Sequence, residues 1–231
     1  MAGRGPTEVD LLYLQMTRIL AGGSMALGGD SHGREVAQRI VGPNRDQWEN
    51  GMDTFSVLDQ SFVEGGMTCS NYLGHRKYEQ LLESTATIVI ILCGGNDLDS
   101  LTVKAEHVLN WHKELFNQLT ARHKIVYILE NPTRFSVRTP GLDYEVFKAQ
   151  RQKLARQDLK VFGNRFIPLP SYCFNKENFE AKHHRRYGVE WVHLKAFCYE
   201  KIATAVLDHV RDDLKNNKSP PSDPKLQLLT R

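Results

Sequence analysis

A serine that lies two residues after a glycine pair is the first candidate for chemistry in this sequence. Ser31 stands in the segment Gly28-Gly29-Asp30-Ser31-His32-Gly33, between an apolar run and a stretch with helical periodicity. A strand, a sharp glycine turn and a helix in this order lift a serine hydroxyl above the end of a sheet. The helix start also directs backbone N–H groups and a partial positive charge toward it. The pattern predicts that Ser31 is a nucleophile; a plain turn or a helix N-cap is the alternative.

A serine nucleophile requires a base that removes its proton. Of the nine histidines, His193 is the strongest candidate because Glu190 precedes it by three residues. One turn of chain can bring the two side chains together, so that the carboxylate holds one imidazole nitrogen and the other nitrogen faces Ser31. We therefore predict a triad of Ser31, His193 and Glu190. The alternative is a solvated Glu–His pair at a helix start.

Acyl transfer at a serine also requires hydrogen-bond donors for the developing oxyanion. Asn96 follows an apolar run after two glycines, and its side-chain amide can donate such a bond there. The backbone N–H groups of Ser31 and of Gly66 are predicted to complete this oxyanion hole, with Gly65 as the alternative to Gly66. The other interpretation of Asn96 is that it only closes a turn between a strand and a helix.

Two further side chains are weaker candidates for substrate binding. His32 lies beside Ser31, where it either contacts the substrate or faces solvent at the helix start. Arg134 follows an apolar run and either binds a carboxylate or phosphate bidentately or forms a salt bridge. The basic run at residues 182–186 would suit an anionic substrate or a nucleic acid, although a solvated loop is the favoured interpretation.

The elements that must position these residues alternate between strands and helices. The apolar, β-branched run at residues 87–93 is typical of a central parallel strand that is covered on both faces. Alternation of this kind predicts an open, mostly parallel five-stranded sheet, with the chemistry beyond the carboxyl ends of its strands. The predicted strands are 24–28, 60–64, 87–93, 124–129 and 165–169, the predicted helices are 8–20, 35–41, 71–83, 103–121, 143–162 and 194–215, and residues 170–190 are predicted to be a loop.

The composition is that of a globular domain. The chain has 231 residues, 41% of them hydrophobic and 25% charged, and a net charge of +3 does not favour nucleic-acid or membrane binding. We predict one domain over residues 8–215 between disordered segments at 1–7 and 216–231. The four cysteines are far apart, which predicts neither a structural zinc site nor a disulfide framework and fits a reducing compartment. Because no signal peptide or membrane-spanning run is visible, we expect an intracellular, cytoplasmic protein.

These motifs together resemble the four blocks of the SGNH/GDSL hydrolase superfamily. The blocks are Gly29-Asp30-Ser31, the glycine at 66, Gly94-Gly95-Asn96-Asp97 and the carboxylate-x-x-His motif near the C-terminus, in the family's order. The resemblance implies a flavodoxin-like three-layer α/β/α sandwich over residues 24–212. Residues 128–135 also resemble the esterase-like domains of some animal mobile-element proteins.

The resemblance further implies ester hydrolysis without a metal or cofactor. By position, Ser31 would be the nucleophile, His193 the general base, and Gly66 and Asn96 the oxyanion donors to a small-molecule ester. One departure is Glu190, because the family usually has aspartate there. Together with the basic run, it motivates the alternative of an SGNH-fold binding or accessory module that has lost turnover and associates with nucleic acid. Acyl transfer to an acceptor other than water uses the same acyl-enzyme, and the oligomeric state is not predicted.

Overall fold

A computed structural model describes residues 24–41, 56–57, 62–184 and 188–216 of the chain. The predicted helix over residues 8–20, the predicted disordered segment 1–7 and the tail beyond Asn216 lie outside these residues. The predicted domain limits therefore stay a prediction. None of the helices in the described part combines the length and the apolar composition that crossing a bilayer requires.

The centre of the described part is a parallel sheet of six strands. Its order is β2-β1-β4-β5-β6, and β3 pairs with the carboxyl-terminal half of β1 on the same edge as β2. Counting β3 as the second strand, this is the flavodoxin-like order. The strands are β1 (Ser24–Gly29), β2 (Ser56–Val57), β3 (Phe62–Val63), β4 (Ile88–Leu92), β5 (Ile125–Leu129) and β6 (Phe166–Ile167).

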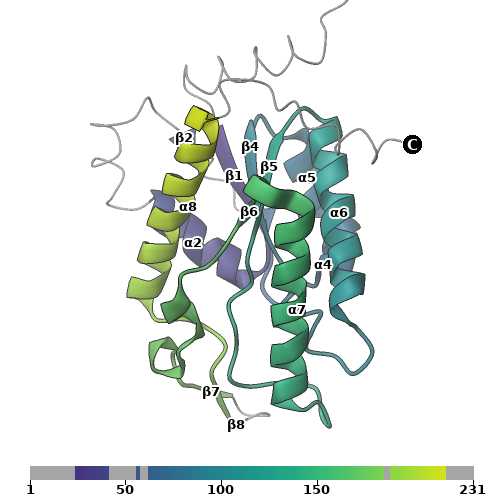
Figure 1. Cartoon of the computed structure of the whole chain (residues 1–231), viewed down its shortest axis with the longest axis vertical. Coiled ribbons are helices and arrows are strands. Elements are labelled where there is room, and N and C mark those ends of the chain that lie inside the picture. The colour runs from purple at the N-terminus through teal and green to yellow at the C-terminus, as the bar shows by residue number, and fades with distance from the viewer. Residues whose placement is uncertain (1–23, 42–55, 58–61, 185–187, 217–231) are drawn as a thin grey trace, which may run out of the picture.

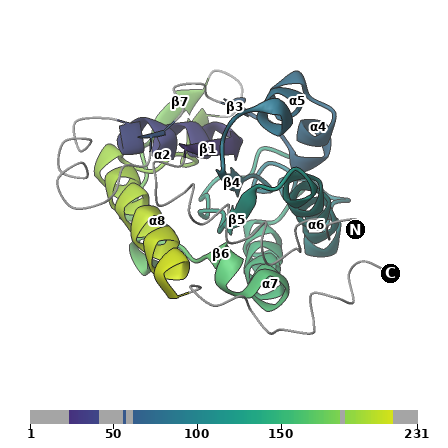
Figure 2. The same cartoon turned by 90° about the horizontal axis from the view of Figure 1, so that it is seen from above.

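Helices cover both faces of this sheet. Figures 1 and 2 show α2 and α8 on one face and α4 to α7 on the other, which makes three layers. This arrangement confirms the predicted α/β/α sandwich, with the short β2 as an addition to the five predicted strands. The helices are α2 (Ser31–Val41), α4 (Cys69–Leu73), α5 (Arg76–Glu83), α6 (Ala105–Ala121), α7 (Tyr144–Phe162) and α8 (Ala196–Asn216).

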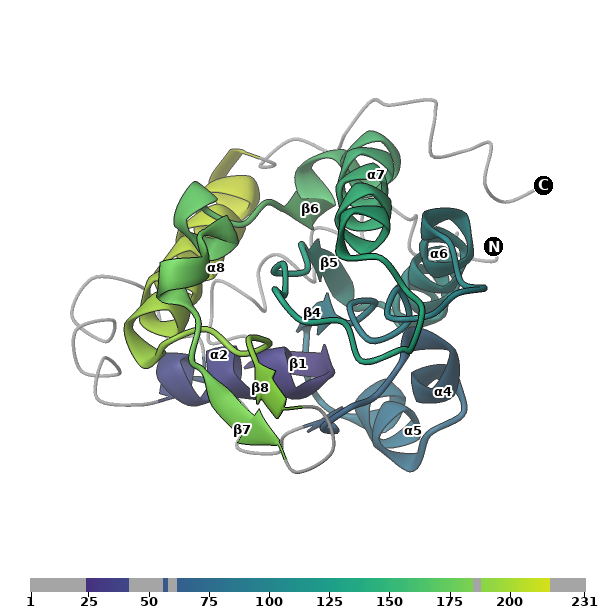
Figure 3. The same ribbon diagram turned by 90° about the horizontal axis from the view of Figure 1, so that it is seen from below.

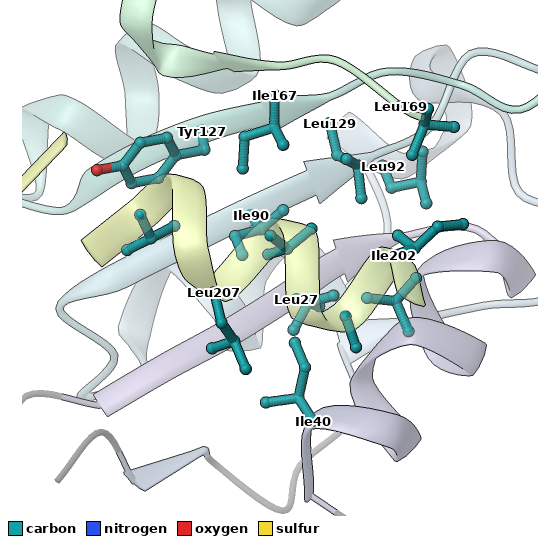
Figure 4. Close-up of a cluster of buried hydrophobic side chains, with 14 of the residues drawn as sticks. Leu27, Ile40, Ile90, Leu92, Tyr127, Leu129, Ile167, Leu169, Ile202 and Leu207 are labelled. Carbon is teal, nitrogen blue, oxygen red and sulfur yellow. The ribbon is translucent and has the colours of Figure 1, made fainter. Parts of the chain in front are cut away.

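The hydrophobic core has two halves, one on each face of the sheet. Successive side chains of a strand point to opposite faces, so Ile88, Ile90 and Leu92 of β4 join one half and Val89 and Ile91 the other. All five are buried, as predicted for a central strand. Figure 4 shows the half between the sheet and α8, which anchors both β1 and α2, the helix that begins at Ser31.

The predicted helix over residues 71–83 is two helices in the structure. Gly74 ends α4, and the His75 side chain accepts a hydrogen bond from the N–H of Lys77 at the start of α5. A capping side chain of this kind starts a new helix because it satisfies an N–H that has no partner within the helix. The hydrophobic spacing continues across this break, and spacing alone therefore predicts a single helix.

The predicted loop over residues 170–190 also contains regular structure. Strands β7 (Lys182–His184) and β8 (Gly188–Glu190) pair in antiparallel fashion, after two short 3₁₀ helices at Ser171–Phe174 and Lys176–Asn178. Figures 1 and 3 show this hairpin at the end of the molecule where α7 and α8 begin. Elements of three or four residues are too short to show a hydrophobic period.

The prediction that the cysteines form no disulfide is wrong for one pair. Cys69, the first residue of α4, is bonded to Cys93, which directly follows β4, with the Cα atoms 5.5 Å apart. Cys173 and Cys198 are buried and free. The pairing joins positions 24 residues apart, and only the packing of α4 against the sheet makes them neighbours.

Reduction of this disulfide is expected to lower the free energy of unfolding by about 3 kcal/mol, because the bond restricts a loop of this length in the unfolded chain. The measurement is a urea unfolding curve with and without a phosphine reductant, after thiol titration has verified two free thiols before reduction and four after it. The Cys69→Ala/Cys93→Ala variant is the control, because its curve should not respond to the reductant. Coincident curves for the oxidised and reduced wild type would contradict the expectation.

Candidate active site

The turn between β1 and α2 requires glycine. Gly29 has φ +124°, and a Cβ atom there would lie 2.0 Å from the carbonyl oxygen of Leu92. The next residue, Asp30, accepts a 2.9 Å hydrogen bond from the N–H of His32 and so caps α2. Burial raises the pKa of the Asp30 carboxyl to about 7. The turn thus makes Ser31 the first residue of α2, at the carboxyl edge of the sheet.

The hydroxyl of Ser31 meets the imidazole of His193. The Oγ and Nε2 atoms lie 3.0 Å apart, although the residues are 162 positions apart in sequence. The backbone holds His193 in place on one side, because its carbonyl accepts a 2.9 Å hydrogen bond from the N–H of Glu180. On the other side, the carbonyl of Trp191 accepts one of 2.8 Å from Phe135. The structure therefore brings together the two groups on which the sequence prediction depends most.

Asn96 lies in the loop after β4, and its side-chain amide is fixed at both ends. Its Nδ2 donates to the carbonyl of Met67 over 3.0 Å, and its Oδ1 accepts from Arg134 over 3.0 Å. The neighbouring Asp97 accepts a 2.8 Å hydrogen bond from the N–H of Cys69. These bonds join the loop after β4 to the segment that carries the predicted glycine donor.

The glycine pair forms an exposed turn directly after β3. Gly66 has φ +75°, and the N–H of Met67 closes the turn on the carbonyl of Glu64. Glu64 in turn donates its N–H to the carbonyl of Gly29 over 2.9 Å, which holds the turn at the end of β1. The turn therefore lies between the segments that carry Ser31 and Asn96, and the choice between Gly65 and Gly66 as oxyanion donor stays a prediction.

Glu190 is the last residue of β8, where it pairs with Lys182 of β7. The structure describes the backbone of Glu190 but not its side chain, so the role of Glu190 beside His193 stays a prediction. The same holds for the basic run, whose first three residues form β7 and whose last two are not described.

The structure places His32 inside the protein rather than in solvent. The side chain is 5% exposed, and its Nδ1 lies 2.7 Å from the hydroxyl of Tyr199 in α8. The His32 and His193 rings lie 5.1 Å apart, and the Tyr199 hydroxyl also accepts a 3.3 Å hydrogen bond from the N–H of Leu194. Sequence analysis missed Tyr199, because its position in the apolar pattern of the last helix indicates only a core residue.

Arg134 is also buried, with an exposed fraction of 3%. Its Nη1 donates to Asp99 over 3.0 Å and its Nη2 donates to Asn96. The salt bridge that was one of the two alternatives for Arg134 is therefore present, and its guanidinium is directed at protein partners. Asp99 is a second residue that sequence analysis did not identify.

One group of side chains in the described part has the composition of a metal site. The ligand atoms of Cys69, Cys93 and His112 lie within 4.8 Å of one another. A metal would need the cysteines as thiolates, and here their sulfurs are bonded to each other. The candidate active site itself consists of groups suited to acyl chemistry at a serine.

No known family model matches the sequence, and no curated protein matches it. Solved structures do match the fold. A GDSL-like lipase from Bacteroides thetaiotaomicron is similar over 89% of this chain and 98% of its own, with a TM-score of 0.55 and 11% identity. A carbohydrate esterase family 3 protein from Talaromyces cellulolyticus is similar over 84% of this chain and 99% of its own, with a TM-score of 0.56 and 12% identity. The psychrotrophic esterase EstA from Pseudoalteromonas sp. is similar over 84% of this chain and 99% of its own, with a TM-score of 0.53 and 15% identity.

The protein therefore has the fold of the SGNH/GDSL hydrolases, which is the fold that the resemblance of its four motifs implies. The narrower resemblance to esterase-like domains of mobile-element proteins stays a prediction.

Proposed function

We propose that this protein is a serine-dependent ester hydrolase of the SGNH/GDSL type. The observation that carries the proposal is the 3.0 Å contact between Ser31 Oγ and His193 Nε2. A serine hydroxyl at this distance from an imidazole can pass its proton to it during attack on a carbonyl carbon. The position of Ser31 at the start of α2 adds N–H groups and a partial positive charge that favour negative charge there.

In the proposed acylation step, Ser31 Oγ bonds to the ester carbonyl carbon while His193 Nε2 accepts the hydroxyl proton. The carbonyl oxygen becomes an oxyanion, which Asn96 Nδ2 and the N–H groups of Ser31 and Gly66 stabilise. His193 then donates the proton to the alcohol oxygen of the ester as the bond between that oxygen and the acyl carbon breaks. Glu190 is proposed to hold the other ring nitrogen of His193 and to stabilise the imidazolium.

In the proposed second step, water replaces the alcohol. His193 accepts a proton from the water molecule, whose oxygen bonds to the acyl carbon, and then returns that proton to Ser31 Oγ as the acyl–enzyme bond breaks. The named esterases and lipases with the same fold support an ester as the substrate class. The step requires no metal or redox cofactor.

A fluorophosphonate probe tests the proposal, since it bonds covalently to an activated serine. Wild-type protein should be labelled with one probe per chain, and Ser31→Ala should not be labelled. Ser171→Ala, which removes an exposed hydroxyl in a 3₁₀ helix, is the matched control and should react like wild type. Labelling that persists in Ser31→Ala, or folded wild type that does not react, would overturn the proposal. The second outcome would favour an accessory module without turnover.

A further inference from the structure

Behind Asn96 lies a buried cation with no direct part in the proposed chemistry. Arg134 follows β5 and is 3% exposed, with its guanidinium carbon 5.5 Å from the centre of the Phe147 ring. Two of its nitrogens donate to two different side chains, Nη1 to Asp99 and Nη2 to Asn96, each over 3.0 Å. The guanidinium therefore bridges a carboxylate and the amide that is proposed to hold the oxyanion.

This bridge determines which end of the Asn96 amide faces which neighbour. A guanidinium has only hydrogen-bond donors, so its partner in the amide has to be the acceptor, Oδ1. The Nδ2 end is thereby directed to the carbonyl of Met67, to which it donates over 3.0 Å. An amide nitrogen carries two hydrogens, and this contact uses one of them. The second hydrogen remains for another acceptor, such as a developing oxyanion.

The choice of arginine has a geometric reason. A planar guanidinium presents two N–H directions in a rigid fork, whereas a lysine ammonium is a single point on a flexible stem. Asp99 compensates the buried charge and also accepts hydrogen bonds from the N–H groups of Arg138 and Thr139 over 3.0 and 3.1 Å. The carboxylate that holds Arg134 is therefore itself held by the backbone of the loop after β5.

We propose that Arg134 is a positioning residue that fixes the orientation of the Asn96 amide before substrate binds. A donor that is already oriented stabilises the oxyanion without reorganisation during the reaction. The catalytic consequence rests on the ester-hydrolase function proposed above, whereas the orientation of the amide does not. Arg134→Lys is the informative variant because it keeps a positive charge beside Asp99 but cannot reach both partners with the same geometry.

The kinetic test is a double-mutant cycle on the second-order rate constant for acylation by the fluorophosphonate probe. Arg134→Lys should lower this constant roughly 10- to 100-fold, the scale of a small misplacement of a catalytic group. In an Asn96→Ala background the same substitution should have almost no effect, because the group through which it acts is gone. If the loss caused by Arg134→Lys is the same in both backgrounds, Arg134 acts as a general structural residue and the inference is overturned.

A second measurement does not depend on activity. The side-chain amide signals of Asn96 are identified by their disappearance from the NMR spectrum of Asn96→Ala. Arg134→Lys should shift these signals and speed their hydrogen exchange toward that of Asn110, an exposed asparagine on α6. Unchanged signals would overturn the inference even in an active enzyme. If Arg134→Lys changes these signals but the probe does not label the wild type, the positioning role is supported and only the ester-hydrolase proposal is contradicted.

Discussion

Replacing His193 by alanine is expected to lower kcat for an aryl ester on the order of 10⁴-fold or more while the protein stays folded. The imidazole of His193 lies within hydrogen-bonding distance of Ser31, with Nε2 3.0 Å from Oγ, and is the proposed base. Without it the hydroxyl has to lose its proton to water, and it is a weak nucleophile at neutral pH. The measurement is the steady-state rate of aryl ester cleavage, with circular dichroism to verify the fold.

The matched control for this prediction is His107→Ala, which removes an exposed histidine from α6. It should keep the rate of the wild type. If His193→Ala retains a tenth or more of the wild-type kcat, His193 is not the base, and the short Ser31–His193 contact has only a structural role.

Replacing Asn96 by alanine is expected to lower kcat about 10²- to 10³-fold, with a small change in KM. The hydrogen bond from the Asn96 amide to the substrate's carbonyl oxygen is strongest when that oxygen carries negative charge. Its loss should therefore raise the activation barrier of acylation rather than weaken substrate binding. Met67 and Arg134 hold the amide in place from two sides, which is the arrangement expected of an oriented donor. Steady-state kinetics with an aryl ester measure both constants.

Asn110→Ala, at an exposed position of α6, is the control for loss of an asparagine and should behave like wild type. An increase in KM with unchanged kcat would mean that Asn96 binds the ground state of the substrate, and its assignment to the oxyanion hole would then be wrong.

The identity of the fold could be predicted because its signals are local. The continuous apolar run that became β4 and the glycine pair before Ser31 both depend on residues that are neighbours in sequence. The same is true of the long helices α6, α7 and α8, whose hydrophobic spacing repeats over several turns. These signals sufficed for the layer arrangement and for the edge of the sheet at which the candidate site lies.

The errors arose where local signals are weak or shared. The break between α4 and α5 lies within an uninterrupted helical spacing, and the hairpin strands have three residues each. Residue type and spacing likewise left two alternatives for His32 and for Arg134. Burial in the structure gave each of them protein partners, Tyr199 for His32 and Asp99 with Asn96 for Arg134.

The order of elements, the glycine turn before Ser31 and the chemical character of Ser31, Asn96 and His193 are properties of the sequence by itself. Only the tertiary structure decided that the Ser31 hydroxyl meets the His193 imidazole across 162 residues, that Cys69 bonds to Cys93, and which way the Asn96 amide points. The reason is physical: backbone preferences act over a few neighbouring residues, whereas side chains that are distant in sequence meet only where the packed layers bring their elements together.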